Sequence, residues 1–104
     1  MCGIAGIQMI DGSPPLKAEL DGLASALAHR GPDGQGQHIR DNLGMVQVRL
    51  AIIDLAGGDQ PFYESEDKPG IALIANGEIY NYLELRESMK DSNFVTNSDC
   101  ELPL

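Results

Sequence analysis

Short apolar runs and helical stripes of hydrophobic residues follow one another along the chain. Residues 2–10 (CGIAGIQMI) form an apolar run that ends at Asp11-Gly12-Ser13, which predicts a buried strand followed by a turn. Leucines then recur at helical spacing over residues 16–27, until Gly31 and Pro32, so the pattern predicts a helix that Ser13 can cap. The core residues expected of this helix are Leu16, Leu20, Leu23 and Leu27.

Three further segments carry strand or loop signals. Residues 30–36 (RGPDGQG) contain three glycines and a proline, so we expect a constrained loop there. Residues 44–54 are rich in β-branched and apolar side chains and predict one or two strands. The run 71–75 (IALIA) predicts a fully buried strand that ends at Asn76-Gly77, a pair that favours positive φ.

Helical signals return in the last quarter of the chain. Asn81 and Glu84 have the spacing of a capping box and precede a helical stripe of apolar residues. Ser98 and Glu101 repeat that spacing, but Pro103 would fall inside the second turn and remove a hydrogen bond. A second helix and the start of a third, short one are therefore predicted.

Composition narrows the class of protein and its partners. The chain has 104 residues, 16 acidic and 7 basic side chains and a net charge of −9, which indicates one acidic domain over residues 1–104. A chain without a basic cluster is repelled by phosphates, so we expect neither nucleic acid nor an anionic membrane as a partner. No apolar run reaches membrane-spanning length and no positive region precedes the first apolar run, so we expect a cytoplasmic protein.

The two cysteines, Cys2 and Cys100, are too few for a disulfide framework or a structural zinc site. Removal of Met1 would make Cys2 the first residue, with a nucleophilic thiol and a free α-amine. Such an amine has a pKa of about 7.7–8.0, so it can accept the proton of its own side chain. The simpler alternative is that Cys2 is a small apolar residue at the start of a strand.

Five blocks of sequence, taken together, carry a family resemblance. They are MCGIAGI at 1–7, RGPDGQG at 30–36, RLAIIDLAGGDQPF at 49–62, NGEIYNYLELR at 76–86 and FVTNSDCE at 94–101. With the five blocks in this order, the chain resembles the class II glutamine amidotransferase domain, an N-terminal nucleophile hydrolase. The resemblance is to the form found in glutamine-hydrolysing asparagine synthetases. The resemblance implies hydrolysis of L-glutamine to glutamate and ammonia through a thioester on Cys2, with the ammonia passed to a synthetase domain.

The resemblance also implies roles for individual residues. The side chain of Asn76 and the backbone N–H of Gly77 would bind the oxyanion, and glycine there would let the backbone approach the substrate closely. Arg49 would bind the α-carboxylate of glutamine and Asp99 its α-ammonium group. Without the resemblance, Arg49 could be a surface ion pair and Asp99 an acidic residue at a helix start. Further residues expected to line the pocket are Leu50, Ala51, Ile52, Ile53 and Glu78.

The fold that the resemblance implies is α+β, an αββα sandwich of the N-terminal nucleophile hydrolase type, with about its first half present. No metal or other cofactor is expected for this chain; ATP and magnesium are expected only for a missing synthetase domain. The expected partners are L-glutamine and a synthetase domain or the missing half of the sandwich. A half sandwich exposes sheet face and edge, so we expect marginal stability or self-association into a homo-oligomer unless a partner covers them.

Three alternatives stay open. The chain could be a truncated glutamine-binding or interaction module without turnover. It could belong to an amidotransferase that makes glucosamine phosphate or phosphoribosylamine, since these share the N-terminal cysteine. A bridge between Cys2 and Cys100 could place the nucleophile under redox control.

Overall fold

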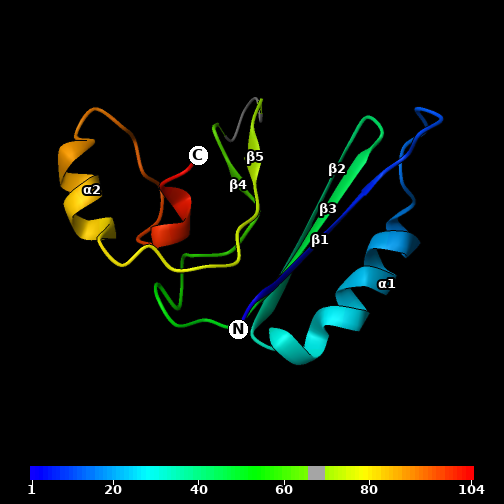
Figure 1. Ribbon diagram of the computed structural model, residues 1–104, viewed down its shortest axis with the longest axis horizontal. Helices are drawn as coiled ribbons and strands as arrows, with labels where there is room; N and C mark the ends of the chain where they lie inside the picture. Colours follow the sequence, from blue (N-terminus) through cyan, green and yellow to red (C-terminus); the bar gives the residue numbers. More distant parts are fainter. Residues whose placement is uncertain (66–69) are drawn as a thin grey trace.

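Two small antiparallel sheets and short helices make up the computed structural model, which describes residues 1–65 and 70–104 (Figure 1). The elements are β1 (Gly3–Gln8), α1 (Lys17–Leu27), the 3-10 helix η1 (Ala28–Arg30), β2 (Gly34–Arg40), β3 (Leu43–Arg49), β4 (Phe62–Tyr63), β5 (Ala72–Leu73), α2 (Tyr82–Ser88) and the 3-10 helix η2 (Asp99–Glu101). This content confirms a mixed domain of helices and sheet.

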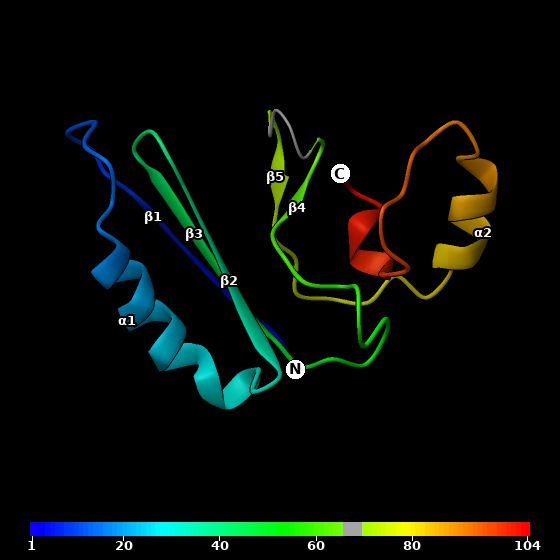
Figure 2. The same cartoon turned by 180° about the vertical axis from the view of Figure 1, so that it is seen from behind.

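The first sheet has the order β1-β3-β2, and α1 lies along one of its faces (Figure 2). Alternate residues of β3 point to this face, where Val46 and Val48 are almost fully buried against Leu20 and Ala24 of α1. On the same face, Gln37 of β2 donates a hydrogen bond to Asp21 of α1 at 2.8 Å. This small core fixes the position of β3, which ends at Arg49, a residue predicted to bind the substrate.

The helix begins later than the sequence predicts. Ser13 does not cap it, because its N–H and hydroxyl both donate to the carboxylate of Asp11, at 3.0 and 2.6 Å. The N-cap is Leu16, whose N–H donates to Glu19 at 2.8 Å. Leu16 is 66% exposed, so the prediction that it belongs to the core is wrong. Leu20 is buried, and Leu23 and Leu27 are partly buried against the core, as expected.

Strand β2 was not predicted, because its glycines have the signature of a loop. The expected loop 30–36 is correct only for residues 31–33, since Arg30 ends η1 and Gly34 and Gly36 lie in the strand. A Cβ at Gly36 would stand 1.6 Å from the carbonyl oxygen of Gln60, so this glycine allows the segment after β3 to lie against β2. Close packing, and not a turn, requires glycine here.

The second sheet pairs β4 with β5, in the register Phe62 to Leu73. The expected buried strand at 71–75 is wrong in extent, since Ile71 is 52% exposed and only Ala72–Leu73 is paired. This sheet meets the first sheet on the face opposite α1: Tyr63 hydrogen-bonds His38 at 3.2 Å, and His38 neighbours Gln37 on the other side of the pleat. The described layers are therefore α1, the first sheet and the second sheet.

The last two helices differ from their predicted form. Helix α2 begins at Tyr82 with Asn81 as its N-cap, as predicted, but no side-chain cap forms there. The third helix is the single 3-10 turn η2, where Ser98 accepts a hydrogen bond from the N–H of Cys100 at 3.2 Å. Glu101 does not complete a capping box; its carboxylate accepts from the N–H groups of Val95 and Thr96 at 2.6 and 2.7 Å. These bonds tie the segment before η2 to η2 itself.

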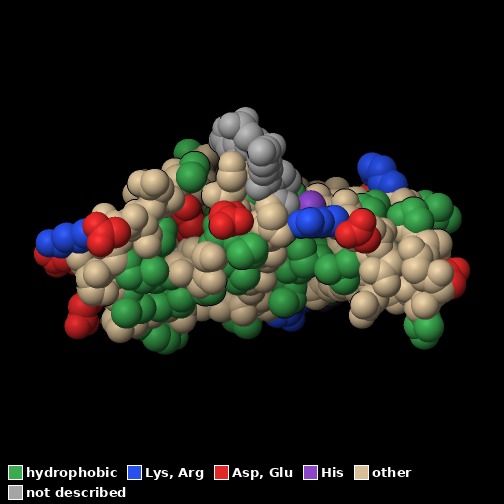
Figure 3. Space-filling model, turned by 90° about the horizontal axis from the view of Figure 1, so that it is seen from above, with side chains coloured by type: hydrophobic (Ala, Val, Ile, Leu, Met, Phe, Trp, Pro, Cys, Tyr) green, Lys and Arg blue, Asp and Glu red, His purple; other side chains and the backbone are tan. Residues whose placement is uncertain are grey.

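Large apolar side chains remain at the surface (Figure 3). Ile10, Tyr80 and Val95 are 104%, 91% and 76% exposed, and the buried core contains few residues. Within residues 1–65 and 70–104, no helix has both the length and the apolar character needed to cross a membrane.

Candidate functional site

A cavity of about 240 Å³ lies where the N-terminus, the end of β3, the segment after β5 and η2 meet. The residues predicted from the sequence line it, with one exception, Ala51. The predicted residues in its wall are Cys2, Arg49, Leu50, Ile52, Ile53, Asn76, Gly77, Glu78 and Asp99. The other lining residues are Met1, Gly58, Gln60, Tyr80, Ser98 and Cys100. The fold thus brings together four segments that are distant in sequence.

The thiol of Cys2 is held by the backbone of Leu50. Pairing of β1 with β3 places Gly3 opposite Val48, so the residue before β1 lies beside the residues that follow β3. The N–H of Leu50 donates to Sγ at 3.3 Å, and Sγ donates to the Leu50 carbonyl at 3.6 Å. Arg30 donates from Nε to the Cys2 carbonyl at 3.0 Å, which fixes the backbone of Cys2.

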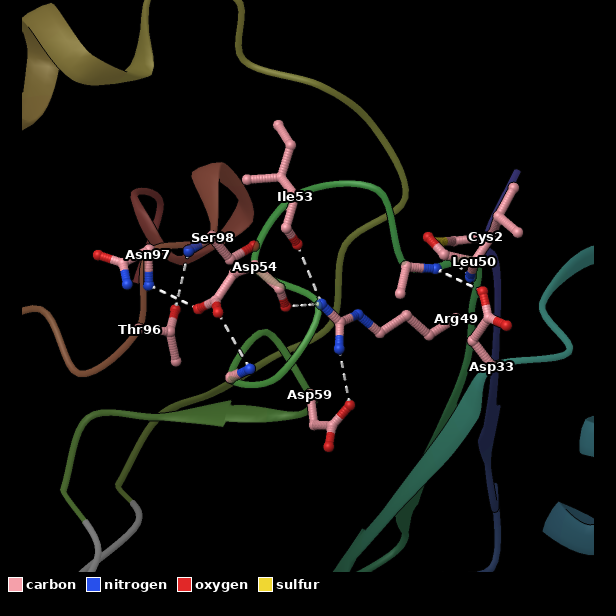
Figure 4. A network of polar contacts seen from close by, with 12 residues as sticks. Cys2, Asp33, Arg49, Leu50, Ile53, Asp54, Asp59, Thr96, Asn97 and Ser98 are labelled. Carbon is pink, nitrogen blue, oxygen red and sulfur yellow. Dashed lines mark hydrogen bonds and ion pairs between the residues drawn. The ribbon is translucent and has the colours of Figure 1, made fainter.

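Arg49 ends β3 and is buried, with 6% of the residue exposed. The ion pair considered as an alternative is present, with the exposed Asp59, but the guanidinium itself is buried. Its guanidinium donates to Asp59 at 2.9 Å, to the carbonyl of Ile53 at 3.0 Å and to the carbonyl of Asp54 (Figure 4). A Cβ at Gly58 would lie 2.5 Å from Nη2, so glycine leaves the space that the guanidinium fills. The other guanidinium N–H groups, including the N–H of Nε, donate to no described residue.

Asn76 and Gly77 lie in an exposed segment after β5. The expectation of positive φ is wrong: among the described residues, only Asp41, Asp54 and Gly12 have positive φ. A Cβ at Gly77 would have no described atom within 4 Å, so the surrounding protein does not require glycine there. No described residue hydrogen-bonds the side-chain amide of Asn76, which leaves the amide available to a ligand.

Asp99 opens η2 and is 4% exposed. Its Oδ2 accepts from the N–H of Ile79 at 2.7 Å, which connects η2 to the segment after Gly77. The thiol of Cys100 donates to the carbonyl of Gly77 at 3.4 Å and reinforces the same connection. Burial, together with the Asp99 carboxylate, raises the pKa of Cys100 to about 11, so this thiol stays protonated at neutral pH.

Ala51 is not part of the cavity wall, and its N–H donates to Asp33 at 2.8 Å. Several residues around the cavity were not predicted. Gly58 had a local signal, because a Gly-Gly pair after a strand indicates close approach of the backbone. Asp54 and Asp59 lie in the block 49–62 that carries the resemblance, but no pattern there indicates their contacts with Arg49.

The cavity combines a thiol, a buried guanidinium, a buried carboxylate and a free carboxamide. Opposite charges at Arg49 and Asp99 suit a small zwitterion, and the thiol of Cys2 suits attack on a carbonyl carbon. Within the described part of the chain, no group of three or more His, Cys, Asp or Glu side chains could hold a metal ion.

Comparison with known proteins identifies the domain type. The model of a glutamine amidotransferase domain family matches residues 1–104. Glutamine-hydrolyzing asparagine synthetase 3 of Arabidopsis thaliana is 46% identical over 103 residues, covering 98% of this chain and 18% of the relative. Glutamine-hydrolyzing asparagine synthetase 2 of Bacillus subtilis is 43% identical over 107 residues, covering 98% and 14%, respectively. The chain thus spans less than a fifth of the length of these relatives.

Proposed function

Since the chain belongs to the glutamine amidotransferase domain family and resembles the N-terminal part of asparagine synthetases, we propose that it hydrolyses L-glutamine to glutamate and ammonia. The observation that carries the proposal is a single cavity lined by Cys2, Arg49, Asn76, Gly77 and Asp99. Each of these residues supplies one group that hydrolysis of a γ-amide on an α-amino acid needs.

Cys2 is the proposed nucleophile, after removal of Met1. Met1 is 74% exposed, so the bond between the two residues is open to a peptidase. The freed α-amine takes the thiol proton, and Sγ attacks the amide carbon of glutamine. When the C–N bond breaks, the proton leaves with ammonia and a γ-glutamyl thioester remains. Water then attacks the thioester, and the thiol of Cys2 recovers a proton as glutamate departs.

The negative charge that develops on the carbonyl oxygen needs donors already in place. We assign this role to the side-chain amide of Asn76 and the N–H of Gly77. The free amide of Asn76 supports the assignment, as does the anchoring of Gly77 to η2 through Cys100 at 3.4 Å. Anchoring of Gly77 limits the reorganisation that its backbone needs during the reaction.

The α-amino acid end of the substrate would lie between Arg49 and Asp99. A carboxylate can take the guanidinium N–H groups of Arg49 that no described residue accepts. Asp99 is buried, and a buried carboxylate is stabilised by a cation, which the α-ammonium group of glutamine would supply. A cavity that binds both the α-carboxylate and the α-ammonium group selects an α-amino acid over an uncharged amide.

We also propose that the two sheets form the inner layers of an αββα sandwich, since α1 covers the outer face of the first sheet and the second sheet packs on its inner face. The ammonia would pass to a synthetase segment, where ATP and magnesium would act; the hydrolysis itself draws on groups of this chain. We place the activity in the cytoplasm, because both cysteines are free and the nucleophile must stay reduced.

Release of glutamate from L-glutamine tests the proposal. The chain is prepared with its N-terminus at Cys2, verified by mass spectrometry, and is compared with Cys2→Ala and with protein that retains Met1. We expect turnover only in the first, and Asp41→Asn, which changes a residue in the distant β2–β3 turn, should leave it unchanged. Glutamine binding without glutamate release would instead select the alternative of a binding module.

A further inference from the structure

Asp54 lies outside the cavity and is hydrogen-bonded on two sides. One contact is with Arg49, and the other is with the segment that leads to Asp99. The backbone carbonyl of Asp54 accepts from Nη2 of Arg49, and its Oδ2 accepts from the N–H of Asn97 at 2.8 Å (Figure 4). Asn97 leads directly into Ser98 and Asp99, which open η2. Asp54 is separated from Asn97 by 43 residues, so this contact joins two distant segments of the chain.

The conformation of Asp54 is fixed by further bonds. Its φ is 52°, in the left-handed region that residues other than glycine seldom adopt. Oδ1 accepts from the N–H of Gly57 at 3.0 Å, and the carbonyl accepts from Gly58 at 3.2 Å. The carboxylate therefore uses one oxygen for its own turn and the other for the segment before η2. This turn holds the carbonyl towards Arg49 and the carboxylate towards Asn97.

We propose that Asp54 is a positioning residue that sets the separation between Arg49 and Asp99, and thereby the specificity of the cavity for α-amino acids. The inference rests on the proposed function, in which these two residues bind the α-carboxylate and α-ammonium groups. A substrate that carries both charges needs both binding groups at the right distance. A reagent that carries neither charge is indifferent to that distance.

Asp54→Asn is the variant of choice, because asparagine has the same size and tolerates positive φ. Its single side-chain oxygen can accept from Gly57 or from Asn97 but not from both. Asp54→Gly removes the carboxylate altogether while favouring the observed φ, so it serves as a second variant if the first does not fold. Asp41→Asn is the matched control, because Asp41 also has positive φ, at 51°, and lies in the β2–β3 turn.

The measurement is the rate of alkylation of Cys2, in the full chain with its N-terminus verified at Cys2. A diazoketone analogue of L-glutamine carries both α-groups, whereas iodoacetamide carries neither, and peptide mass spectrometry reports the adduct at Cys2 alone. The ratio of the two rates is the selectivity for an α-amino acid. The iodoacetamide rate also reports whether the thiol remains in place in each variant.

We expect Asp54→Asn and Asp54→Gly to lower this ratio about tenfold, as for the loss of one hydrogen bond to a charged group, with the iodoacetamide rate unchanged. Asp41→Asn should retain the wild-type ratio. Wild-type selectivity that persists in both Asp54 variants would overturn the inference and leave the proposed function intact. A wild-type chain with no preference for the analogue would contradict the proposed function itself, and the inference with it. A parallel loss of both rates would show a structural role for Asp54 and also overturn the inference.

Discussion

Replacement of Gly36 by alanine tests how the site is attached to the sheet. A Cβ at this position would stand 1.6 Å from the carbonyl oxygen of Gln60 and 2.7 Å from its carbonyl carbon. Ordinary van der Waals contact begins at 3.4 Å, so the backbone around Gln60 would have to withdraw by nearly 2 Å. Because the obstacle is backbone and lies in the segment that follows Arg49, no side-chain rotation can relieve it.

The expected cost combines two contributions. Overpacking of a well-packed contact costs about 1–3 kcal/mol. Withdrawal of Gln60 also breaks the hydrogen bond of 2.6 Å from the N–H of Ala75 to its side chain, worth about 1 kcal/mol. We therefore expect Gly36→Ala to lower the free energy of unfolding by about 2–4 kcal/mol. The intrinsic preference of strands for alanine over glycine acts in the opposite direction, so a loss of stability must come from the clash.

Urea unfolding followed by circular dichroism gives the free energy from the midpoint and slope. Gly22→Ala is the matched control: Gly22 is exposed inside α1, and a Cβ there has no described atom within 4 Å. Alanine is the better helix former, so this variant should be more stable by about 0.5–1 kcal/mol. A Gly36→Ala protein within about 0.5 kcal/mol of wild type, with Gly22→Ala stabilised as expected, would refute the packing of the Gln60 segment on β2.

Three further outcomes concern the cavity. Arg49→Lys should weaken L-glutamine binding about 10–100-fold by calorimetry, because an ammonium group cannot replace the planar guanidinium; unchanged affinity would count against Arg49 as the carboxylate ligand. Gly58→Ala should raise the KM for glutamine about tenfold with little change in kcat, because a Cβ would displace Nη2 of Arg49; an unaltered KM would show that the guanidinium has room to move. Burial and the Asp99 carboxylate favour the neutral thiol of Cys100 and raise its pKa to about 11, so near pH 8 the reactive thiolate is roughly one thousandth of the thiol. Alkylation at Cys100 should therefore rise about tenfold per pH unit until about pH 11. A plateau in the alkylation rate below about pH 10, measured by peptide mapping, would contradict that shift.

The sequence predicts the elements that have a clear hydrophobic period. Strand β1, most of β3, helix α1 and helix α2 fall where the apolar pattern indicates them. Two details are wrong: β1 is only partly buried, with Gly3 its one buried residue, and the strand expected over 44–54 ends at Arg49. Strand β2 escapes prediction because Gly34 and Gly36 are dictated by a partner distant in sequence, the segment around Gln60. Glycine near other glycines predicts a turn from local information, and only the folded chain reveals the close packing.

In the candidate site, too, some residues could be identified from the sequence and others could not. Residues identified by the family resemblance lie together in the cavity, although their chemical roles stay predictions. Ala51 illustrates the limit of that approach: it does not line the cavity although Leu50, Ile52 and Ile53 do, and its N–H is bonded to Asp33. Asp54 illustrates another limit: its contact with Asn97 depends on the folded arrangement of two segments, which no local pattern encodes.

Direct observation of the acyl-enzyme is the sharpest test of the central claim that Cys2 hydrolyses glutamine. The chain that begins at Cys2 is mixed with L-glutamine, quenched in acid within the first turnover and digested, and the peptide that contains Cys2 is weighed. The account predicts a γ-glutamyl adduct on Cys2 that disappears on longer incubation as glutamate accumulates, and that is absent when Met1 is retained. Release of glutamate with no adduct on Cys2 at any quench time, or undiminished release by Cys2→Ala, would contradict it.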